Sequence, residues 1–399
     1  MYKTDPATIT LQMQDAHQRT LALLDGLNDA QLMGPRLATV NPLRWEVGHA
    51  AYFYEYWVLR QHLGQPSIRA DSDSLYDSIS IAHDDRWDLP LPSLHETLSY
   101  IETVLQRVSA CLTRGSDTQR DYLAQYAVFH QDMHNEAYTY TRQTLNYPAP
   151  DIARAEHRIR NAGGLQGDVQ IPGGQFMLGA SQQDGFVFDN EKWAHPRTVK
   201  PFSIARAAVS NADFLAFVEA GGYHKKHYWS DAGWDWRESA GLQQPLYWRK
   251  SAQGWQIREF DEWHPLALNA ALIHVSWHEA QAYCGWAQRR LPTELEWEVA
   301  AAGQPSADGK TLSPHKRYFP WGEQAPRADQ ANLNGYALGT NDVGAHAAGD
   351  SAFGCRQMIG NVWEWTQDNF GPYPGFTPDM YADYSQPLFG STRVLRGGA

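Results

Sequence analysis

Two histidines four residues apart provide the clearest candidate for chemistry in this chain. They are His130 and His134, within YAVFHQDMHNEAYTYTRQ at residues 126–143. Because an α-helix advances about 100° per residue, side chains four apart point nearly the same way and can bind one metal ion. Glu136 points away from that direction, so we expect it to have a supporting or structural role. The pair alone also fits ordinary surface or core histidines.

A third histidine on another predicted helix favours the metal site. His49 lies within WEVGHAAYF, an aromatic-rich helical stretch. Helix bundles commonly build metal pockets from inward-facing residues of different helices. Imidazole binds zinc, copper, iron and nickel, so the ligand type leaves the metal open. Solvated or capping roles are predicted for most of the remaining histidines, which include His17, His62, His83 and His95.

Residues 1–150 are predicted to form the bundle that positions these histidines. Apolar residues recur at three- and four-residue spacing, which is typical of amphipathic helices, within 10–27, 42–64, 93–112 and 126–143. Asn41 and Pro42 resemble a cap and a first-turn proline at the start of the second helix, and Gly64 ends it. Four such helices predict a four-helix bundle.

The second half of the chain has a different pattern. Residues 151–170 are predicted to be a linker with one short helix, because prolines and glycines are frequent in NYPAPDIARAEHRIRNAGG at 146–164. From 171 to 399, Gly, Pro and Trp are frequent and apolar runs are short. Helical periodicity survives mainly near 210–220 and 276–302. We therefore expect a loop-rich α+β domain after the helical bundle.

Composition excludes several classes of protein. The net charge of -12 opposes non-specific binding to nucleic acid. No run approaches the ~18 apolar residues of a membrane span. Three widely spaced cysteines predict neither a disulfide framework nor a CxxC site, and the simplest setting is a reducing cytoplasm. With 16 Trp and 20 Tyr, the chain can surround a small cationic substrate with aromatic walls.

Several motifs in the second half give the chain a family resemblance. They are IPGGQFMLG, FDNEKWAHP, RLPTELEWE, YFPWGE, GNVWEWT, PYPGF and VLRGG, in that order. Together they resemble the formylglycine-generating-enzyme-like (FGE-sulfatase) domain, which has a C-type-lectin-like fold. With a His-x3-His helix and an upstream WExGH helix, the whole resembles ergothioneine sulfoxide synthases and the related selenoneine synthases. Their first domain is a DinB-like bundle.

The resemblance implies a function and a metal. His49, His130 and His134 would hold a non-haem Fe(II), and O2 would be a co-substrate. The expected reaction joins selenium or sulfur to the imidazole C2 of hercynine, a trimethylated histidine. The family also uses a tyrosine as a proton donor, for which Tyr373 is the first candidate and Tyr381 the second. Loop packing is the alternative role for both tyrosines.

This sequence departs from the family pattern at positions that are expected to bind the sulfur or selenium donor and the substrate. Enzymes that use γ-glutamylcysteine carry two arginines before an LPLP-like stretch, whereas IAHDDRWDLPLP offers Arg86 and places His83 at the first position. One guanidinium makes a weaker carboxylate clamp than two, so a selenosugar or smaller thiol is favoured. Met133 stands where a substrate-binding Gln is common, and a thioether cannot donate that hydrogen bond.

Other polar and aromatic residues have two possible roles. Trp365 and Phe376 are candidates for substrate contact, because aromatic faces attract a trimethylammonium group; core packing is the alternative. Asn332, Asn334, Asn361 and Glu364 lie where this fold sometimes binds calcium, although loop-stabilising hydrogen bonds are favoured.

The resemblance also predicts that residue 399 truncates the second domain, since relatives continue with residues that contact hercynine. The formylglycine-generating enzymes use a cysteine pair in that tail, and Cys284 and Cys355 have no nearby partner in the sequence.

Three alternatives to a selenium-dependent synthase remain open. One is an ergothioneine sulfoxide synthase that uses cysteine or γ-glutamylcysteine. The others are a zinc-dependent DinB-type thiol transferase and an inactive binding module.

Overall fold

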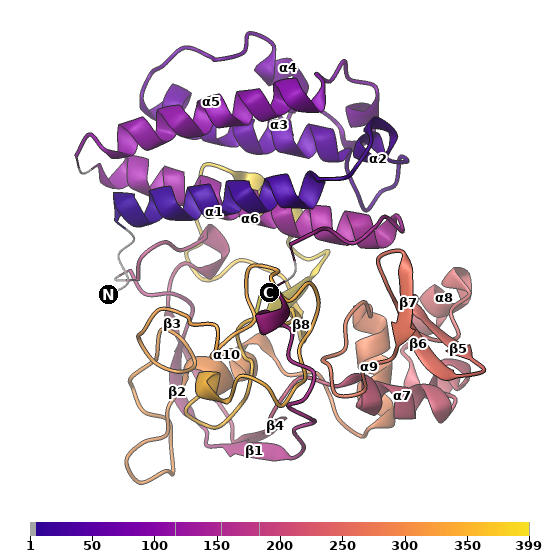
Figure 1. The fold of residues 1–399 in the computed structure, drawn as a ribbon. Helices are drawn as coiled ribbons and strands as arrows, with labels where there is room; N and C mark the ends of the chain where they lie inside the picture. The colour runs from indigo at the N-terminus through magenta and orange to yellow at the C-terminus, as the bar shows by residue number, and fades with distance from the viewer. Residues whose placement is uncertain (1–4, 116, 153, 183, 399) are drawn as a thin grey trace. The chain divides into compact units, whose positions relative to one another are not determined.

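A computed structural model describes residues 5–115, 117–152, 154–182 and 184–398. The chain divides into two compact units (Figure 1). The first, the helical unit, comprises Lys3–Ile152 together with the short segment Glu259–Glu262. The second, the mixed unit, comprises Ala153–Arg258 and Trp263–Ala399.

The helical unit contains four long helical segments, as the apolar periodicity predicts. Helix α1 packs along α6, and α3 packs against both α5 and α6 (Figure 1). Helix α3 continues directly into η1, a π-helical segment. The bounds in chain order are α1 Pro6–Leu24, α2 Asp29–Met33, α3 Leu43–Tyr54, η1 Glu55–His62, α4 Ser72–Tyr76, η2 His83–Trp87, α5 Leu94–Leu112 and α6 Thr118–Thr144.

Local capping explains where most of these helices begin. Ser93 and Glu96 form a capping box at the start of α5, and Asp117 accepts a hydrogen bond from the backbone of Arg120 in α6. The predicted cap at Asn41 is wrong, because α3 begins after Pro42 and has no side-chain cap. The Asn41 amide instead donates to the carboxylate of Glu46, 2.9 Å away.

The mixed unit is built from short antiparallel strands joined by loops. Strand β1 pairs with β4, β2 with β3 and β8 with β9, while β5, β6 and β7 form a three-stranded sheet. Their bounds are β1 Asp168–Ile171, β2 Gly174–Leu178, β3 His195–Val199, β4 Phe202–Ala205, β5 Trp248–Ser251, β6 Gly254–Glu259, β7 Glu262–Pro265, β8 Glu364–Asn369 and β9 Arg393–Arg396. This order confirms the predicted α+β character.

Helices of the mixed unit pack on these strands. The predicted periodicity near 210–220 corresponds to α7, and that of 276–302 corresponds to α9 and α10, which Pro292 separates. Helix α8 has no counterpart among the helices predicted from the sequence. The bounds are η3 Ala155–His157, η4 Asp189–Glu191, α7 Asn211–Glu219, η5 Gly222–His224, η6 Lys226–Tyr228, α8 Asp231–Ala240, α9 Trp277–Trp286, α10 Glu294–Ala302, η7 Ala347–Gly349, η8 Ala382–Tyr384 and η9 Gln386–Leu388.

Two of the hydrophobic clusters in the mixed unit pack its helices against its strands. One joins α10 to β2 and β3 through residues such as Phe176, Trp297 and Met358. The other is aromatic and gathers Phe214, Trp248 and their neighbours around α7 and α9. These clusters account for many of the tryptophans that the sequence analysis considered for an aromatic substrate wall.

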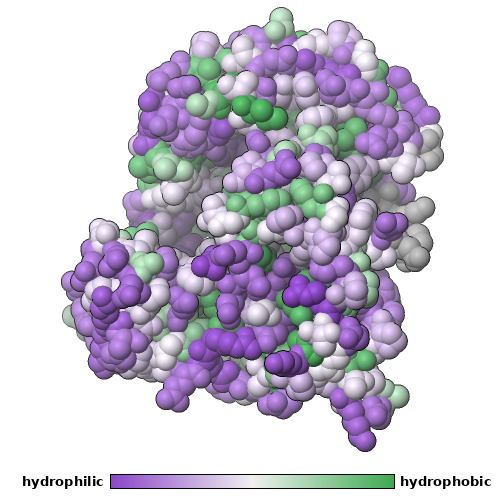
Figure 2. All heavy atoms as spheres, turned by 180° about the vertical axis from the view of Figure 1, so that it is seen from behind, coloured by the Kyte–Doolittle hydropathy of each residue, from purple (hydrophilic) through white to green (hydrophobic). Residues whose placement is uncertain are grey.

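The surface is mainly polar. Hydrophilic residues cover most of the face in Figure 2, and the hydrophobic ones form separate small groups. Among the described residues, no helix combines the length and the apolar character needed to cross a bilayer. The three cysteines are free thiols and are buried, in agreement with the absence of a predicted disulfide framework.

Candidate metal centre

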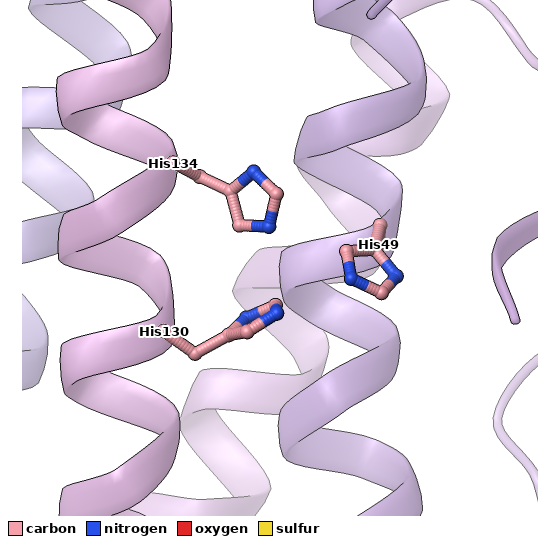
Figure 3. A group of neighbouring side chains, drawn as sticks. All are labelled: His49, His130 and His134. Carbon is pink, nitrogen blue, oxygen red and sulfur yellow. The ribbon is translucent and has the colours of Figure 1, made fainter. Parts of the chain in front are cut away.

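Three histidines of the helical unit converge between α3 and α6. His49 comes from α3, and His130 and His134 come from successive turns of α6 (Figure 3). One ring nitrogen of each lies within 4.8 Å of one from each of the others. Metal–imidazole distances are about 2.1 Å, so the three rings would move closer together to bind one ion. Glu136 is exposed and lies outside this cluster.

A backbone carbonyl selects the tautomer of His49. Its Nδ1 lies 2.7 Å from the carbonyl oxygen of Tyr76, at the end of α4. A carbonyl can only accept a hydrogen bond, so Nδ1 carries the proton and Nε2 keeps its lone pair. The lone pair on Nε2 is the one that a ligand to a metal ion needs.

Aromatic rings hold the other side chains of the cluster. The ring of His130 stacks on Phe53, with centroids 3.9 Å apart and planes inclined by 13°. Trp45 stacks on the His49 ring at 4.7 Å and 8°. His49 and His130 are almost completely buried, whereas the His134 side chain is 15% exposed. Packing thus restricts the rotamers that the ligands can adopt.

Burial keeps two of these imidazoles neutral. It lowers the pKa of His49 well below its usual value, and the neighbouring His134 ring and the guanidinium of Arg86 act in the same direction. Burial also lowers the pKa of His130 well below the ordinary value, with further contributions from His134 and His49. Neutral imidazole is the form that ligates metals. The donor set therefore fits a divalent transition metal without selecting iron over zinc, copper or nickel.

Comparison with known proteins supports this two-part organisation. Residues 12–146 match the family model described as the DinB superfamily, and residues 154–399 match the sulfatase-modifying factor enzyme 1-like domain. A hercynine oxygenase of Mycolicibacterium thermoresistibile is 37% identical over 406 residues, covering 98% of this chain and 88% of the relative. The chain belongs to the hercynine oxygenase family. The predicted pairing of a DinB-like bundle with an FGE-sulfatase domain is thereby confirmed.

Other relatives match either nearly the whole chain or about two thirds of it. A hercynine oxygenase of Mycobacterium tuberculosis is 36% identical over 403 residues and covers 99% of this chain and 92% of its own length. A formylglycine-generating enzyme of Streptomyces coelicolor is 33% identical over 270 residues, covering 63% of this chain and 84% of the relative. Of these three relatives, the two hercynine oxygenases span both parts of the chain.

Arg86 lies beside the metal ligands, as part of a stacked series of side chains. Its guanidinium carbon is 4.0 Å from the centroid of Trp45, which in turn stacks on His49. Its Nη1 donates to Oδ1 of Asn41 at 2.8 Å. This placement keeps a positive charge close to the histidine cluster, where the family resemblance predicts contact with the donor.

His83 and Met133 also belong to the helical unit. Nε2 of His83 lies 2.8 Å from the carbonyl oxygen of Val40, and Nδ1 lies 2.9 Å from the carboxylate of Asp84. Both ring nitrogens of His83 therefore have partners within the protein. Met133 precedes His134 on α6 and is 38% exposed. Substrate contact by either residue stays a prediction.

The candidate proton donors lie in the mixed unit. The hydroxyl of Tyr373 donates to Oε1 of Glu294 at 2.8 Å, and burial beside that carboxylate raises the pKa of the phenol. Tyr381 is also buried, and its ring meets Tyr384 edge to face at 4.9 Å. Tyr373 thus holds its proton firmly and has a carboxylate partner that the sequence analysis did not identify. The only sequence signal for that partner is the RLPTELEWE motif, which contains Glu294.

Trp365 and Phe376 have structural contacts of their own. The indole of Trp365 donates to the carbonyl oxygen of Val275 at 3.1 Å, and the side chain is half-buried. Phe376 packs edge to face on Phe389 with centroids 5.1 Å apart. These contacts agree with the packing alternative for both residues, and their contact with substrate stays a prediction.

The loop residues considered for calcium are engaged in hydrogen bonds. Nδ2 of Asn332 donates to Oδ1 of Asn361 at 3.0 Å, and the same oxygen accepts from the backbone of Asn341 at 2.7 Å. Asn361 also donates to Gln357. Asn334 is exposed. The loop-stabilising role is therefore visible for Asn332 and Asn361, and a calcium ion is not needed to explain their positions.

Proposed function

We propose that this protein is an iron(II)- and O2-dependent synthase that forms a C–Se or C–S bond at the imidazole C2 of hercynine. The convergence of His49, His130 and His134 in a chain that matches hercynine oxygenases along nearly its whole length carries the proposal. A bound iron(II) would supply Lewis acidity toward a thiol or selenol and a redox-active centre for dioxygen. A cytoplasmic location accompanies the proposal as an expectation from the cysteine content.

With a sulfur donor, the proposed reaction is a four-electron oxidation that gives a sulfoxide and water. Loss of the C2–H and S–H hydrogens, with formation of one C–S and one S–O bond, supplies four electrons. One molecule of O2 accepts them and yields the sulfoxide oxygen and one water. Within the chain, Tyr373 is the proposed proton donor, and its raised pKa keeps the proton on the phenolic oxygen at neutral pH.

The donor is proposed to be a neutral selenosugar. Arg86 is the single guanidinium of segment His83–Trp87, and the ring nitrogens of His83 have protein partners. This segment therefore offers one guanidinium, whereas two would match a donor with two carboxylates. Cysteine and γ-glutamylcysteine are the alternative donors.

A competition assay tests the function and the donor together. Protein purified without oxygen is loaded with iron(II), mixed with hercynine and equal amounts of a selenosugar, cysteine and γ-glutamylcysteine, and then exposed to air. Mass spectrometry should show a hercynine derivative substituted at C2, mainly with selenium. If no donor gives such a product, the proposed function is wrong, whereas a dominant sulfur product would replace the donor assignment alone.

Metal analysis tests the zinc alternative separately. Because three imidazoles do not select the metal, protein purified without added metal is analysed for its metal content, and the assay is repeated without oxygen. Iron with an absolute requirement for oxygen is the expected result. Stoichiometric zinc with activity that does not need oxygen would favour a thiol transferase.

A further inference from the structure

One buried carboxylate next to the histidine cluster has a hydrogen-bond partner on only one of its two oxygens among the described residues. Glu46 lies on α3, three residues before His49, and is 1% exposed. Its Oε1 accepts a hydrogen bond from Nδ2 of Asn41 at 2.9 Å. Its Oε2 is buried and forms no hydrogen bond with any described residue. Because an unsatisfied buried carboxylate oxygen is costly, it requires an explanation.

A nitrogen of the metal-ligand candidate His134 lies close to this oxygen. Its Nδ1 lies 3.4 Å from Oε2 of Glu46 and is also buried without a hydrogen bond among the described residues. Figure 3 shows the other nitrogen of this ring, Nε2, facing His49 and His130. A histidine that binds a metal through Nε2 carries its proton on Nδ1. Metal ligation would therefore create the N–H donor that Glu46 lacks.

We propose that Glu46 is a positioning residue that accepts the Nδ1–H hydrogen bond of His134 and aims Nε2 at the metal. The inference rests on the proposed metal centre. His49 already shows the matching arrangement, since its Nδ1–H donates to the carbonyl of Tyr76. Outer carboxylates and carbonyls of this kind fix the tautomer and orientation of ligating histidines.

The orientation of the Asn41 amide explains why position 46 requires a carboxylate. Its Oδ1 accepts from Nη1 of Arg86, so its Nδ2 must face Glu46 as a donor. Glu46 therefore lies between two donors, Asn41 and His134. A carboxylate accepts at both oxygens, whereas the amide of glutamine has one acceptor oxygen and one NH2 group. Glu46→Gln can satisfy one donor and must confront the other with its own N–H.

Cobalt(II) binding to the full-length chain provides the test. Affinity is measured by titration, and the visible spectrum of the bound cobalt reports the ligand geometry independently of turnover. Glu46→Gln should weaken cobalt binding about 10- to 100-fold and shift its visible bands. Glu136→Gln is the matched control, because this exposed glutamate lies two residues from His134 in sequence but outside the cluster. It should behave as the wild type does.

Each outcome addresses a different claim. Equal affinity and an unchanged spectrum in Glu46→Gln would overturn the positioning role while leaving the proposed function intact. Failure of the wild type to bind cobalt at all would instead count against the metal centre and the proposed function.

A second measurement covers the case in which Glu46→Gln does not fold. In wild-type protein with 15N-labelled histidine and bound cobalt, the Nδ1–H signal of His134 should exchange slowly with solvent, because Glu46 holds it. Rapid exchange of that proton, with slow exchange of the His49 proton as the internal reference, would overturn the inference.

Discussion

Individual side chains of the histidine cluster are prepared for metal binding by burial and by fixed hydrogen bonds. Burial lowers the pKa of His49 and His130, and the Tyr76 carbonyl fixes the proton of His49 on Nδ1. Both effects favour the neutral ligand form. Metal binding by the cluster should therefore depend on each histidine and on the groups that bury it or accept its hydrogen bond.

Replacement of one ligand should abolish tight metal binding without unfolding the bundle. In His130→Ala, a single ring is lost from the pocket, and we expect metal affinity to fall by more than about 100-fold, beyond the effect typical of outer-shell residues. Metal analysis after dialysis and far-ultraviolet circular dichroism measure the two properties. His95→Ala removes an exposed histidine of α5 and is the control. Full metal occupancy in His130→Ala would show that the ligands are misassigned.

A carboxyl group of the mixed unit should make stability depend on pH. Burial raises the pKa of Glu364 to about 7 from a usual value of 4.5. Between these values the folded state binds a proton that the unfolded state releases, so the wild type loses stability as the pH rises through this window. Glu364→Gln does not titrate, and its advantage over the wild type should increase from pH 4.5 to pH 8 by at most about 3 kcal/mol.

Urea unfolding of both proteins at pH 5 and pH 8 measures that difference. Glu238→Gln, which alters an exposed side chain of α8 in the same unit, should show no comparable pH dependence. An equal stability difference at both pH values for Glu364→Gln would mean that Glu364 is ionised in the folded state at pH 5.

At the scale of secondary structure, α3 combines a metal ligand with a close helix contact. Gly48 precedes His49, and a Cβ atom at this position would lie 2.1 Å from the ring of Tyr76. Tyr76 also supplies the carbonyl that orients His49. The small residue therefore sets how closely α4 approaches α3, and through that distance it affects the ligand.

Gly48→Ala should disturb both stability and metal binding. The added methyl group forces Tyr76 away, which we expect to cost about 1–3 kcal/mol of folding stability, as in other overpacked sites. Loss of the carbonyl contact to His49 should also weaken cobalt binding. In the double variant Gly48→Ala/Tyr76→Leu the ring is absent, so the stability losses should be less than additive. Strict additivity would show that the clash does not cause the effect.

At the scale of the whole molecule, the three histidines of the candidate metal centre all lie in one of the two units. The cluster joins α3 to α6 within the helical unit, whereas Tyr373, Tyr381, Trp365 and Phe376 belong to the mixed unit. A metal ion would cross-link two helices that are about 80 residues apart in sequence, an effect comparable to closing a long loop. Its stabilising effect should appear first in those helices.

Hydrogen exchange measured by mass spectrometry tests this localisation. Addition of cobalt(II) should slow exchange in peptides that cover Leu43–Tyr54 and Thr118–Thr144, because ligation suppresses local opening of both helices. Peptides that cover β1 to β4 should change little. Protection concentrated in those strands would place the principal metal site in the mixed unit.

Short-range geometry accounts for the features that the sequence predicted correctly. The i,i+4 spacing places His130 and His134 on one face of any helix that forms there, and apolar periodicity defined the long helices of the bundle. The motif order of the second half was sufficient to identify its domain. In contrast, the prediction that Asn41 caps α3 was wrong. An asparagine side chain can cap the first turn of a helix or bond to another side chain, and here the amide of Asn41 donates to Glu46.

The remaining features depended on how the helices pack. The approach of His49 to His130, the choice of tautomer by Tyr76 and the position of Glu46 beside His134 all join residues from different elements. The same is true of the bond from Tyr373 to Glu294 in the mixed unit. Residue spacing determines directions only within one helix or strand, whereas distances between elements follow from the packing of many side chains at once. For this reason the pair of histidines on one face of α6 was predictable from the sequence, and the tertiary structure alone decided what surrounds them.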